Sequence, residues 1–342
     1  DAVKASEYEP SQEPQEQVSE EEVSENADEH NAQLKAASDA SAQSGNIYSG
    51  TGWNLGETDK KLVIESDAGM AGWCTVKTSQ PTTYYKDKIT SVEIKDGVSY
   101  IGDEAFKFCQ GMMSVTIPSS VTSIGSSAFE ICTSLPQITI PNSVKNIEAR
   151  AFASCSQLTE ITIPNITNIK AYAFRSCEGL KTITIPNSVT SIGEGAFSWC
   201  SGAETITIPN SVTSIGEDAF SGCSGVETIT IPNSVKSMGD GVLKECDALK
   251  DVKLPNDITS IGKETFSQCI NLTSITIPDS VTSIGEMAFA FCSSLESITL
   301  PDKTTDIGRA AFGMCEKLTS ITIPDSVTSI GDSAFALCSS LE

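Results

Sequence analysis

Histidine, basic side chains and long apolar runs are all scarce in this sequence. His30 is the one histidine, so the rest of the chain cannot supply a Ser-His-Asp or Cys-His nucleophile arrangement. The 342 residues carry 45 acidic against 22 basic side chains, a formal net charge of −23. Such a chain repels phosphate backbones and anionic lipid, so we expect neither nucleic acid nor a membrane surface as a partner. No apolar run approaches the roughly 20 residues that a membrane-spanning helix needs.

Other sequence motifs that typically serve catalysis or metal binding are also missing. The sequence contains no Gly-rich phosphate loop, and its carboxylates are scattered over turns without the apolar neighbours that would raise a pKa. The 12 cysteines include no Cys-x-x-Cys spacing of the kind that metal sites use. We therefore expect no enzymatic activity, no cofactor and no metal.

The first 47 residues differ in composition from the rest. They are rich in Glu, Ser, Gln and Ala and almost free of aromatic and branched apolar side chains. Such a segment cannot bury enough apolar surface to offset its chain entropy. We predict a disordered acidic tail or spacer over residues 1–47.

Residues 48–86 are predicted to form an N-terminal capping unit. The segment 52–70, "GWNLGETDKKLVIESDAGM", reads as a strand, a polar turn and a second strand. Trp53 and Trp73 are expected in its core, because aromatic side chains are generally buried. A stack of repeats exposes an apolar end, and an atypical terminal unit normally covers that end.

From residue 87 the sequence repeats with a period of 23, as in residues 211–233, "SVTSIGEDAFSGCSGVETITIPN". A phenylalanine stands three residues before each cysteine of the repeat, with Leu243 as the one substitute, and a proline closes each "ITIP". One repeat unit cannot bury its own apolar side, but a stack of units can. The cysteines mark the register at positions 109, 132, 155, 177, 200, 223, 246, 269, 292, 315 and 338, where a single interval, from 155 to 177, is 22 residues.

Each part of the unit predicts a local structure. "ETITIP" (227–232) alternates polar and β-branched apolar residues, which indicates a strand with Ile229 and Ile231 facing inward. "PNS" supplies turn chemistry, and "SVTSIG" is a second extended piece whose glycine allows a left-handed backbone. "EDAFSGC" (217–223) is expected to form about two turns of helix with Ala, Phe and Cys pointing into the coil.

The spacing of the cysteines favours buried, unreactive thiols. Stacked repeats point their cysteines in the same direction, which does not suit disulfide geometry. A Cys without a disulfide behaves as a small buried hydrophobe. Cys74, which is not one of the cysteines that mark the repeat, is the one candidate for a reactive thiol.

The pattern Leu-x-x-Ile-x-Ile-Pro followed by Val-x-x-Ile-Gly-x-x-Ala-Phe-x-x-Cys resembles the repeat of the BspA-like leucine-rich repeat proteins. The resemblance covers residues 87–342, about 11 units with the last one incomplete. It implies an α/β-type repeat solenoid, a right-handed stack with a parallel β-sheet on its concave side. It also implies a bacterial protein that is secreted or displayed on the cell surface, with its signal peptide removed, and that contacts host proteins or other cells.

The outward side of the strands is the candidate binding surface. A threonine ladder runs along it, interrupted only by Lys253, and the unit 233–255 also places Lys250 and Asp251 on or beside the sheet. Threonine also simply suits an exposed sheet, and one drifted repeat would account for the charged unit as well. The candidate contact residues are Thr162, Thr184, Thr207, Thr230, Lys250, Asp251, Lys253 and Thr276.

The expected function is non-enzymatic adhesion of a monomer to a protein or glycan on a host or neighbouring cell. The alternatives are a structural spacer with no ligand of its own and a glycan-binding module. Turn residues Asn210 and Asn233 are expected to lie outside the contact surface. If that surface is not the strand face, the flank that bears Trp199, Phe291 and Met314 is the next candidate.

Overall fold

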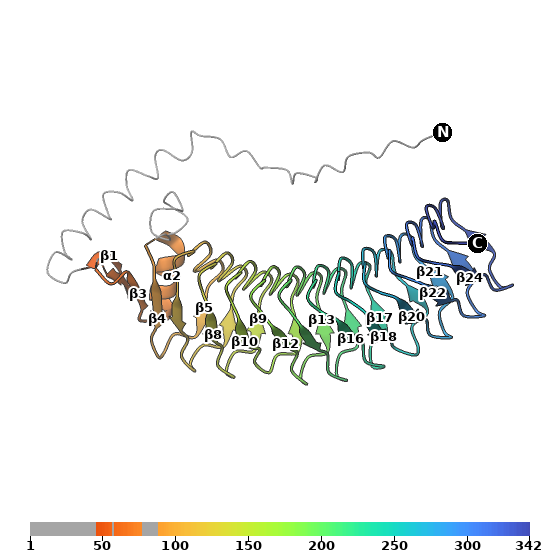
Figure 1. The fold of residues 1–342 in the computed structure, drawn as a ribbon. Coiled ribbons are helices and arrows are strands. Elements are labelled where there is room, and N and C mark those ends of the chain that lie inside the picture. The colour runs from red at the N-terminus through yellow and green to blue at the C-terminus, as the bar shows by residue number, and fades with distance from the viewer. Residues whose placement is uncertain (1–45, 57, 77–87) are drawn as a thin grey trace, which may run out of the picture.

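The computed structural model describes residues 46–56, 58–76 and 88–342, which form one curved row of stacked coils behind an N-terminal unit (Figure 1). The tail predicted over residues 1–47 lies outside the described residues except for its last two, which begin strand β1 (Asn46–Gly50). In the part of the chain that the structure describes, no helix combines the length and the apolar character needed to cross a bilayer.

The capping unit contains a helix that the sequence analysis did not predict. Strands β1, β2 (Trp53–Gly56) and β3 (Lys61–Ile64) pair in antiparallel fashion, and β3 then pairs in parallel with β4 (Ser91–Ile94), the first strand of the solenoid. Helix α2 (Asp67–Val76) follows β3. The burial predicted for Trp53 and Trp73 is confirmed, with the two rings edge to face at 5.4 Å between centroids.

Helix α2 has a clear local cause. Ser66 precedes it, and its Oγ accepts a hydrogen bond from Gly69 N at 3.1 Å, which is the capping contact of a helix N-terminus. Glycine is required at position 69 because a Cβ there would lie 1.8 Å from Gly52 O. Trp73 then ties the helix to the first coil, since its Nε1 donates to Ala105 O at 2.7 Å.

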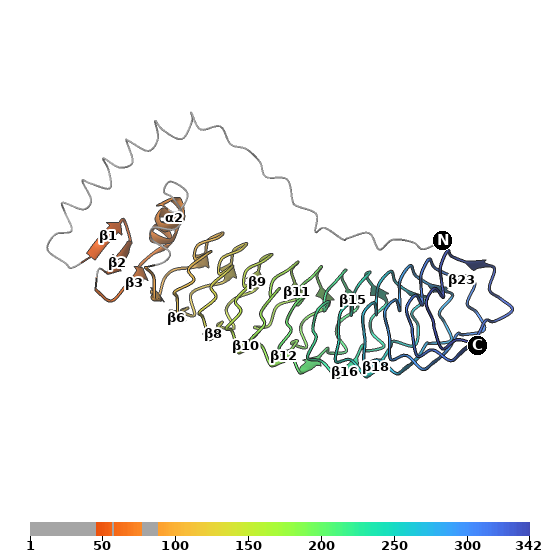
Figure 2. The same ribbon diagram turned by 45° about the horizontal axis from the view of Figure 1, so that its top comes forward.

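The first coil contributes β4 and a two-residue strand, and each later coil contributes one three-residue and one two-residue strand. Where strands of successive coils pair, they do so in parallel with a shift of one repeat, as between Ile183 and Ile206. Figure 2 shows the two series along different edges of the solenoid. The three-residue series is β6 (Ser114–Thr116), β8 (Gln137–Thr139), β10 (Glu160–Thr162), β12 (Thr182–Thr184), β14 (Thr205–Thr207), β16 (Thr228–Thr230), β18 (Asp251–Lys253), β20 (Ser274–Thr276), β22 (Ser297–Thr299) and β24 (Ser320–Thr322).

The two-residue series carries the "SI" dipeptide or its equivalents. It comprises β5 (Tyr100–Ile101), β7 (Ser123–Ile124), β9 (Asn146–Ile147), β11 (Asn168–Ile169), β13 (Ser191–Ile192), β15 (Ser214–Ile215), β17 (Ser237–Met238), β19 (Ser260–Ile261), β21 (Ser283–Ile284), β23 (Asp306–Ile307) and β25 (Ser329–Ile330). The stacked solenoid with parallel strands, predicted from the repeat, is confirmed.

The helix predicted over 217–223 and its equivalents is wrong. Among the described coils this segment is a chain of turns, with positive φ at Asp218 (51°) and Gly222 (71°). The N–H groups of Asp218, Phe220 and Gly222 donate to carbonyls of the next coil, at 2.9, 3.1 and 2.7 Å. Packed helices lie about 8–10 Å apart, whereas strand pairing sets neighbouring coils about 4.8 Å apart. A helix in every coil therefore does not fit, and turns that bond from coil to coil replace it.

The glycine of "SVTSIG" also has a different role from the predicted one. Gly216 is not among the residues with positive φ; the left-handed residue is Asp218, two positions later. A Cβ on Gly216 would lie 2.6 Å from Glu194 N and 2.7 Å from Gly193 C in the preceding coil. Glycine is favoured here because two backbones approach closely, not because the turn needs a left-handed conformation.

The core is a column of phenylalanine rings beside a column of thiols. Neighbouring rings stack, as for Phe152 and Phe174 with centroids 5.6 Å apart and planes 1° from parallel. Ten of the 12 cysteines are buried, no disulfide joins cysteines in the described residues, and Cys200 Sγ donates to Phe174 O at 3.2 Å. Burial raises the pKa of the Cys200 thiol to about 12. The predicted inward placement of Phe and Cys is confirmed.

Candidate functional site

The threonine face, defined here as the outward first and third residues of the three-residue strands, is exposed along the solenoid. In β14, Thr205 and Thr207 are exposed and Ile206 between them is buried. Alternation of the strand side chains produces this arrangement, because every second residue points to the same side. The face therefore presents rows of short hydroxyl side chains backed by isoleucines of the core.

A shallow hollow of about 790 Å³ opens on the middle of this face. Four threonines line it, Thr205 and Thr207 from β14 and Thr228 and Thr230 from β16, with Lys253 from β18. The turns that follow β14 and β16 add Asn210, Pro232, Asn233 and Ser234 to the lining. We call this site the central hollow.

The central hollow lies where the strand ladder is interrupted. β12 pairs with β14 and β16 pairs with β18, but in the described structure β14 and β16 are not paired. The ladder has similar interruptions between β6 and β8, β10 and β12, and β18 and β20. The coils that carry β14 and β16 are therefore joined by their turns and their core rather than by pairing in this sheet.

Two buried hydroxyls beside the interruption lack partners. In other coils the serine two residues after the strand proline donates to a carbonyl of the preceding coil, as Ser143 Oγ does to Val121 O at 2.7 Å and Ser188 Oγ to Ile166 O at 2.8 Å. The equivalent Oγ atoms of Ser211 and Ser234 are buried and have no hydrogen-bond partner among the described residues. A buried polar atom left unpaired typically costs about 1–3 kcal/mol. Ser234 Oγ is enclosed by the protein, so the missing hydrogen bond is a cost of packing at this turn and not a group that a ligand in the hollow can reach.

The charged residues of unit 233–255 separate into two groups. Lys250 Nζ pairs with Glu227 Oε1 at 2.9 Å, with 57% of the lysine side chain exposed, so its charge is largely neutralised outside the hollow. Asp251 is exposed at the start of β18. Lys253 lines the hollow beside Thr230 and makes no ion pair with any carboxylate of the described residues.

The structure brings together three of the candidate contact residues, Thr207, Thr230 and Lys253. Thr162, Thr184 and Thr276 are exposed on the same face but outside the hollow, and Lys250 and Asp251 lie beside it.

The contribution of the turns to the hollow was not predicted from the sequence. Asn210 and Asn233, expected outside the contact surface, belong to its lining together with Ser234. No local signal could have identified them, because the same "PNS" turn occurs in coils that have no part in the hollow.

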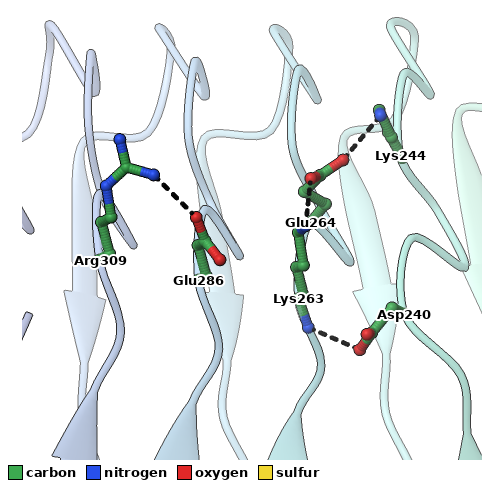
Figure 3. Close-up of polar contacts among 6 residues, drawn as sticks. All are labelled: Asp240, Lys244, Lys263, Glu264, Glu286 and Arg309. Carbon is green, nitrogen blue, oxygen red and sulfur yellow. Dashed lines mark hydrogen bonds and ion pairs between the residues drawn. The ribbon is translucent and has the colours of Figure 1, made fainter. Parts of the chain in front are cut away.

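A second group of charged side chains lies at the corner after the two-residue strands (Figure 3). Lys244 pairs with Glu264 at 2.6 Å and Arg309 with Glu286 at 3.1 Å, while the backbone N of Lys263 donates to Asp240 Oδ1 at 2.8 Å. Each pair links two neighbouring coils. Because the cations are neutralised by adjacent carboxylates, this corner contributes contacts between coils rather than a site for a charged ligand.

The described ranges contain no arrangement of side chains suited to metal binding or to acid–base catalysis. No three His, Cys, Asp or Glu side chains gather there into a set that could hold a metal ion. Burial raises the pKa of Asp218 above its ordinary value, opposed by the nearby charge of Lys244. No histidine lies in these ranges to act with that carboxyl as an acid–base pair.

Known bacterial proteins share this architecture. A leucine-rich repeat protein from Bacteroides ovatus is 30% identical, with 75% of this chain and 78% of that chain covered and a TM-score of 0.61. A leucine rich cell surface protein from Faecalibacterium prausnitzii is 32% identical over 86% of this chain and 93% of that chain, with a TM-score of 0.53. A leucine-rich repeat protein from Eubacterium ventriosum, 24% identical with 84% and 92% covered and a TM-score of 0.53, shares the fold.

The comparison with the curated proteins gives no match. The model of the BspA type leucine rich repeat region matches residues 77–204, 167–283 and 259–342, in six copies. These matches together extend over more than half of the sequence and agree with the solenoid observed. The chain belongs to the BspA-type leucine-rich repeat family.

Proposed function

We propose that this protein is a non-enzymatic binding protein of the bacterial surface or its surroundings, which contacts a protein or glycan of another cell through its threonine face. The observation that carries the proposal is the continuous exposed face with the central hollow at its middle. The likeness to a leucine rich cell surface protein at 32% identity supports the location.

The dimensions of the face favour a macromolecular partner. Ten three-residue strands at a spacing of about 4.8 Å give a surface on the order of 45 Å long. Small molecules are usually held in deep, mostly apolar pockets, whereas the central hollow is open and is lined by polar and apolar side chains alike. Short hydroxyl side chains lose little conformational entropy on contact, so many weak contacts can add up along such a face.

A structural spacer is the competing function. The turn segments bond from coil to coil through backbone groups, as between Phe220 N and Val242 O at 3.1 Å, and a stiff rod needs no ligand. The unpaired Lys253 favours binding over this alternative, because it does not contribute to rigidity.

Charge and bulk placed on the face distinguish the two functions. The variant Thr207→Glu with Thr230→Arg should fold normally, since exposed strand substitutions usually change stability by less than about 0.5 kcal/mol. Binding to a glycan array and to immobilised mucin should fall at least tenfold, because both changes lie in the centre of the contact surface.

The matched control is Ser237→Glu with Ser260→Arg. These serines are exposed on β17 and β19, in neighbouring coils but on the other strand series. The control should bind like the wild type. Equal losses in both variants would place the contact surface elsewhere, and no binding by the wild type to either target would favour the spacer.

A further inference from the structure

Lys253 gives the central hollow a feature that the rest of the threonine face lacks. The equivalent position is threonine in nine other coils, so the lysine is a local departure from the repeat. On a chain of net charge −23, it is a cation that no described carboxylate neutralises. An ammonium group without an ion pair, set among hydroxyl and amide groups, is a binding partner for a carboxylate.

The other lining groups match a sugar. Thr205, Thr207, Thr228 and Thr230 offer hydroxyls that both donate and accept hydrogen bonds, and Asn233 offers a carboxamide. Saccharides present hydroxyls around a ring and an apolar ring face. The backing isoleucines and a proline supply the apolar contact.

The charge balance limits the class of acidic ligand. Polyanions such as nucleic acids need several cations, and they meet the repulsion of the whole acidic chain. One unpaired lysine suits one carboxylate. A peptide that extends the sheet would need an accessible strand edge, whereas the strands of this face present their side chains.

We propose that the central hollow binds a carboxylate-bearing sugar residue, a sialic or uronic acid, of a glycan. Lys253 Nζ pairs with the carboxylate, and the threonine hydroxyls bind the sugar hydroxyls. This assignment rests on the proposed function, since the hollow is part of the threonine face, and it names the class of glycan recognised there.

The test compares sugars that differ only in the carboxylate. Wild-type protein is titrated with sialyllactose against lactose, and with a glucuronic acid disaccharide against its neutral glucose counterpart. We expect one acidic sugar to bind at least tenfold more tightly than its neutral match. Lys253→Thr, which restores the residue of nine other coils, should abolish that preference and fold normally.

The matched control is Lys250→Thr, which removes the same charge from the neighbouring exposed lysine, already paired with Glu227 outside the hollow. It should keep the preference for the acidic sugar. The absence of any preference in the wild type, an unchanged preference in Lys253→Thr, or equal competition by a Glu-rich peptide would overturn the assignment.

The two proposals can fail separately. If Thr207→Glu with Thr230→Arg loses mucin binding while Lys253→Thr retains any acidic preference, the threonine face remains the contact surface and the acidic sugar assignment is wrong. If the threonine-face variant binds mucin and the array like its control, the proposed function fails.

Discussion

The phenylalanine column is interrupted once, and the interruption allows a quantitative test of how the coils pack. Between Phe220 and Phe266 the column holds Leu243, and the residue before it is Val242 where nine coils carry alanine. Both side chains are fully buried. The larger Val242 and the smaller Leu243 therefore share the volume that Ala and Phe occupy elsewhere. Replacing both, as Val242→Ala with Leu243→Phe, should restore the regular column.

The magnitudes follow from the neighbouring coils. Val242→Ala alone removes two carbon groups, at about 0.8 kcal/mol each, and so costs about 1.6 kcal/mol before any cavity term. Leu243→Phe alone forces a ring against the retained valine, and such overpacking costs about 1–3 kcal/mol.

Together the two changes create ring pairs with Phe220 and Phe266. Stacked pairs elsewhere in the column lie 5.2–5.8 Å apart, and such a pair contributes about 0.5–1.5 kcal/mol beyond its buried area. The double variant should therefore be at least as stable as the wild type, with a coupling energy of about 2 kcal/mol or more between the two sites.

The assay is a double-mutant cycle. Urea unfolding of the four proteins gives the overall stabilities, and amide exchange of the coils between residues 219 and 269 gives the local values. The local measurement is needed because the units of a repeat stack contact only their neighbours. Two costs that add within about 0.5 kcal/mol would refute the shared-volume argument, and so would a double variant less stable than either single one.

Three further predictions concern the thiols, one buried carboxyl and the cap. Thiol titration at pH 8 should leave Cys200 unlabelled, because a pKa of about 12 leaves on the order of one thiolate in ten thousand. Among the cysteines of the repeat, the half-buried Cys338 should be labelled first. Rapid labelling of Cys200 would contradict this prediction. Burial raises the pKa of Asp218 above the ordinary 3.8. The contribution of this carboxyl to stability is therefore present below pH 3.8 and is lost as the pH rises through the pKa of the folded state. Asp218→Asn should have a higher urea midpoint than the wild type at about pH 7 and little advantage at about pH 3. Trp73→Phe removes the hydrogen bond to Ala105 O and should destabilise the cap by about 1–3 kcal/mol, seen as faster exchange of the first coil while the middle coils keep their protection.

Sequence periodicity predicted those features that depend on one coil and its copies. Alternation in "ETITIP" was enough to place Ile229 in the core and Thr230 on the surface, because a strand directs successive side chains to opposite sides. The fixed interval between Phe220 and Cys223 likewise placed both inside. These inferences need no knowledge of the distance between coils.

Features that depend on the distance between neighbouring coils could not be predicted from one unit of the sequence. The segment 217–223 has the composition of a short helix, and only the close stacking of neighbours excludes it. Helix α2 was hidden by glycines within it, although Gly69 is there because the helix backbone approaches Gly52. The central hollow is lined by residues from the coils of β14, β16 and β18, so no single unit of sequence encodes it.

The positions at which single residues depart from the repeat bear on where a ligand would be recognised. A side chain that occurs in nine coils makes nine similar surfaces, so it can supply affinity along a face but cannot by itself mark one position on it. Unit 233–255 combines a change in the core, at Leu243, with a change at the surface, at Lys253. Random drift would tolerate the change at Leu243, because leucine and valine together fill the volume. It would neither favour nor oppose the change at Lys253. A ligand that carries one carboxylate would select the second specifically, because Lys253 lines the central hollow. We therefore propose that the repeated threonines and the single lysine contribute separately, the former to contact area and the latter to the position and charge of what is bound.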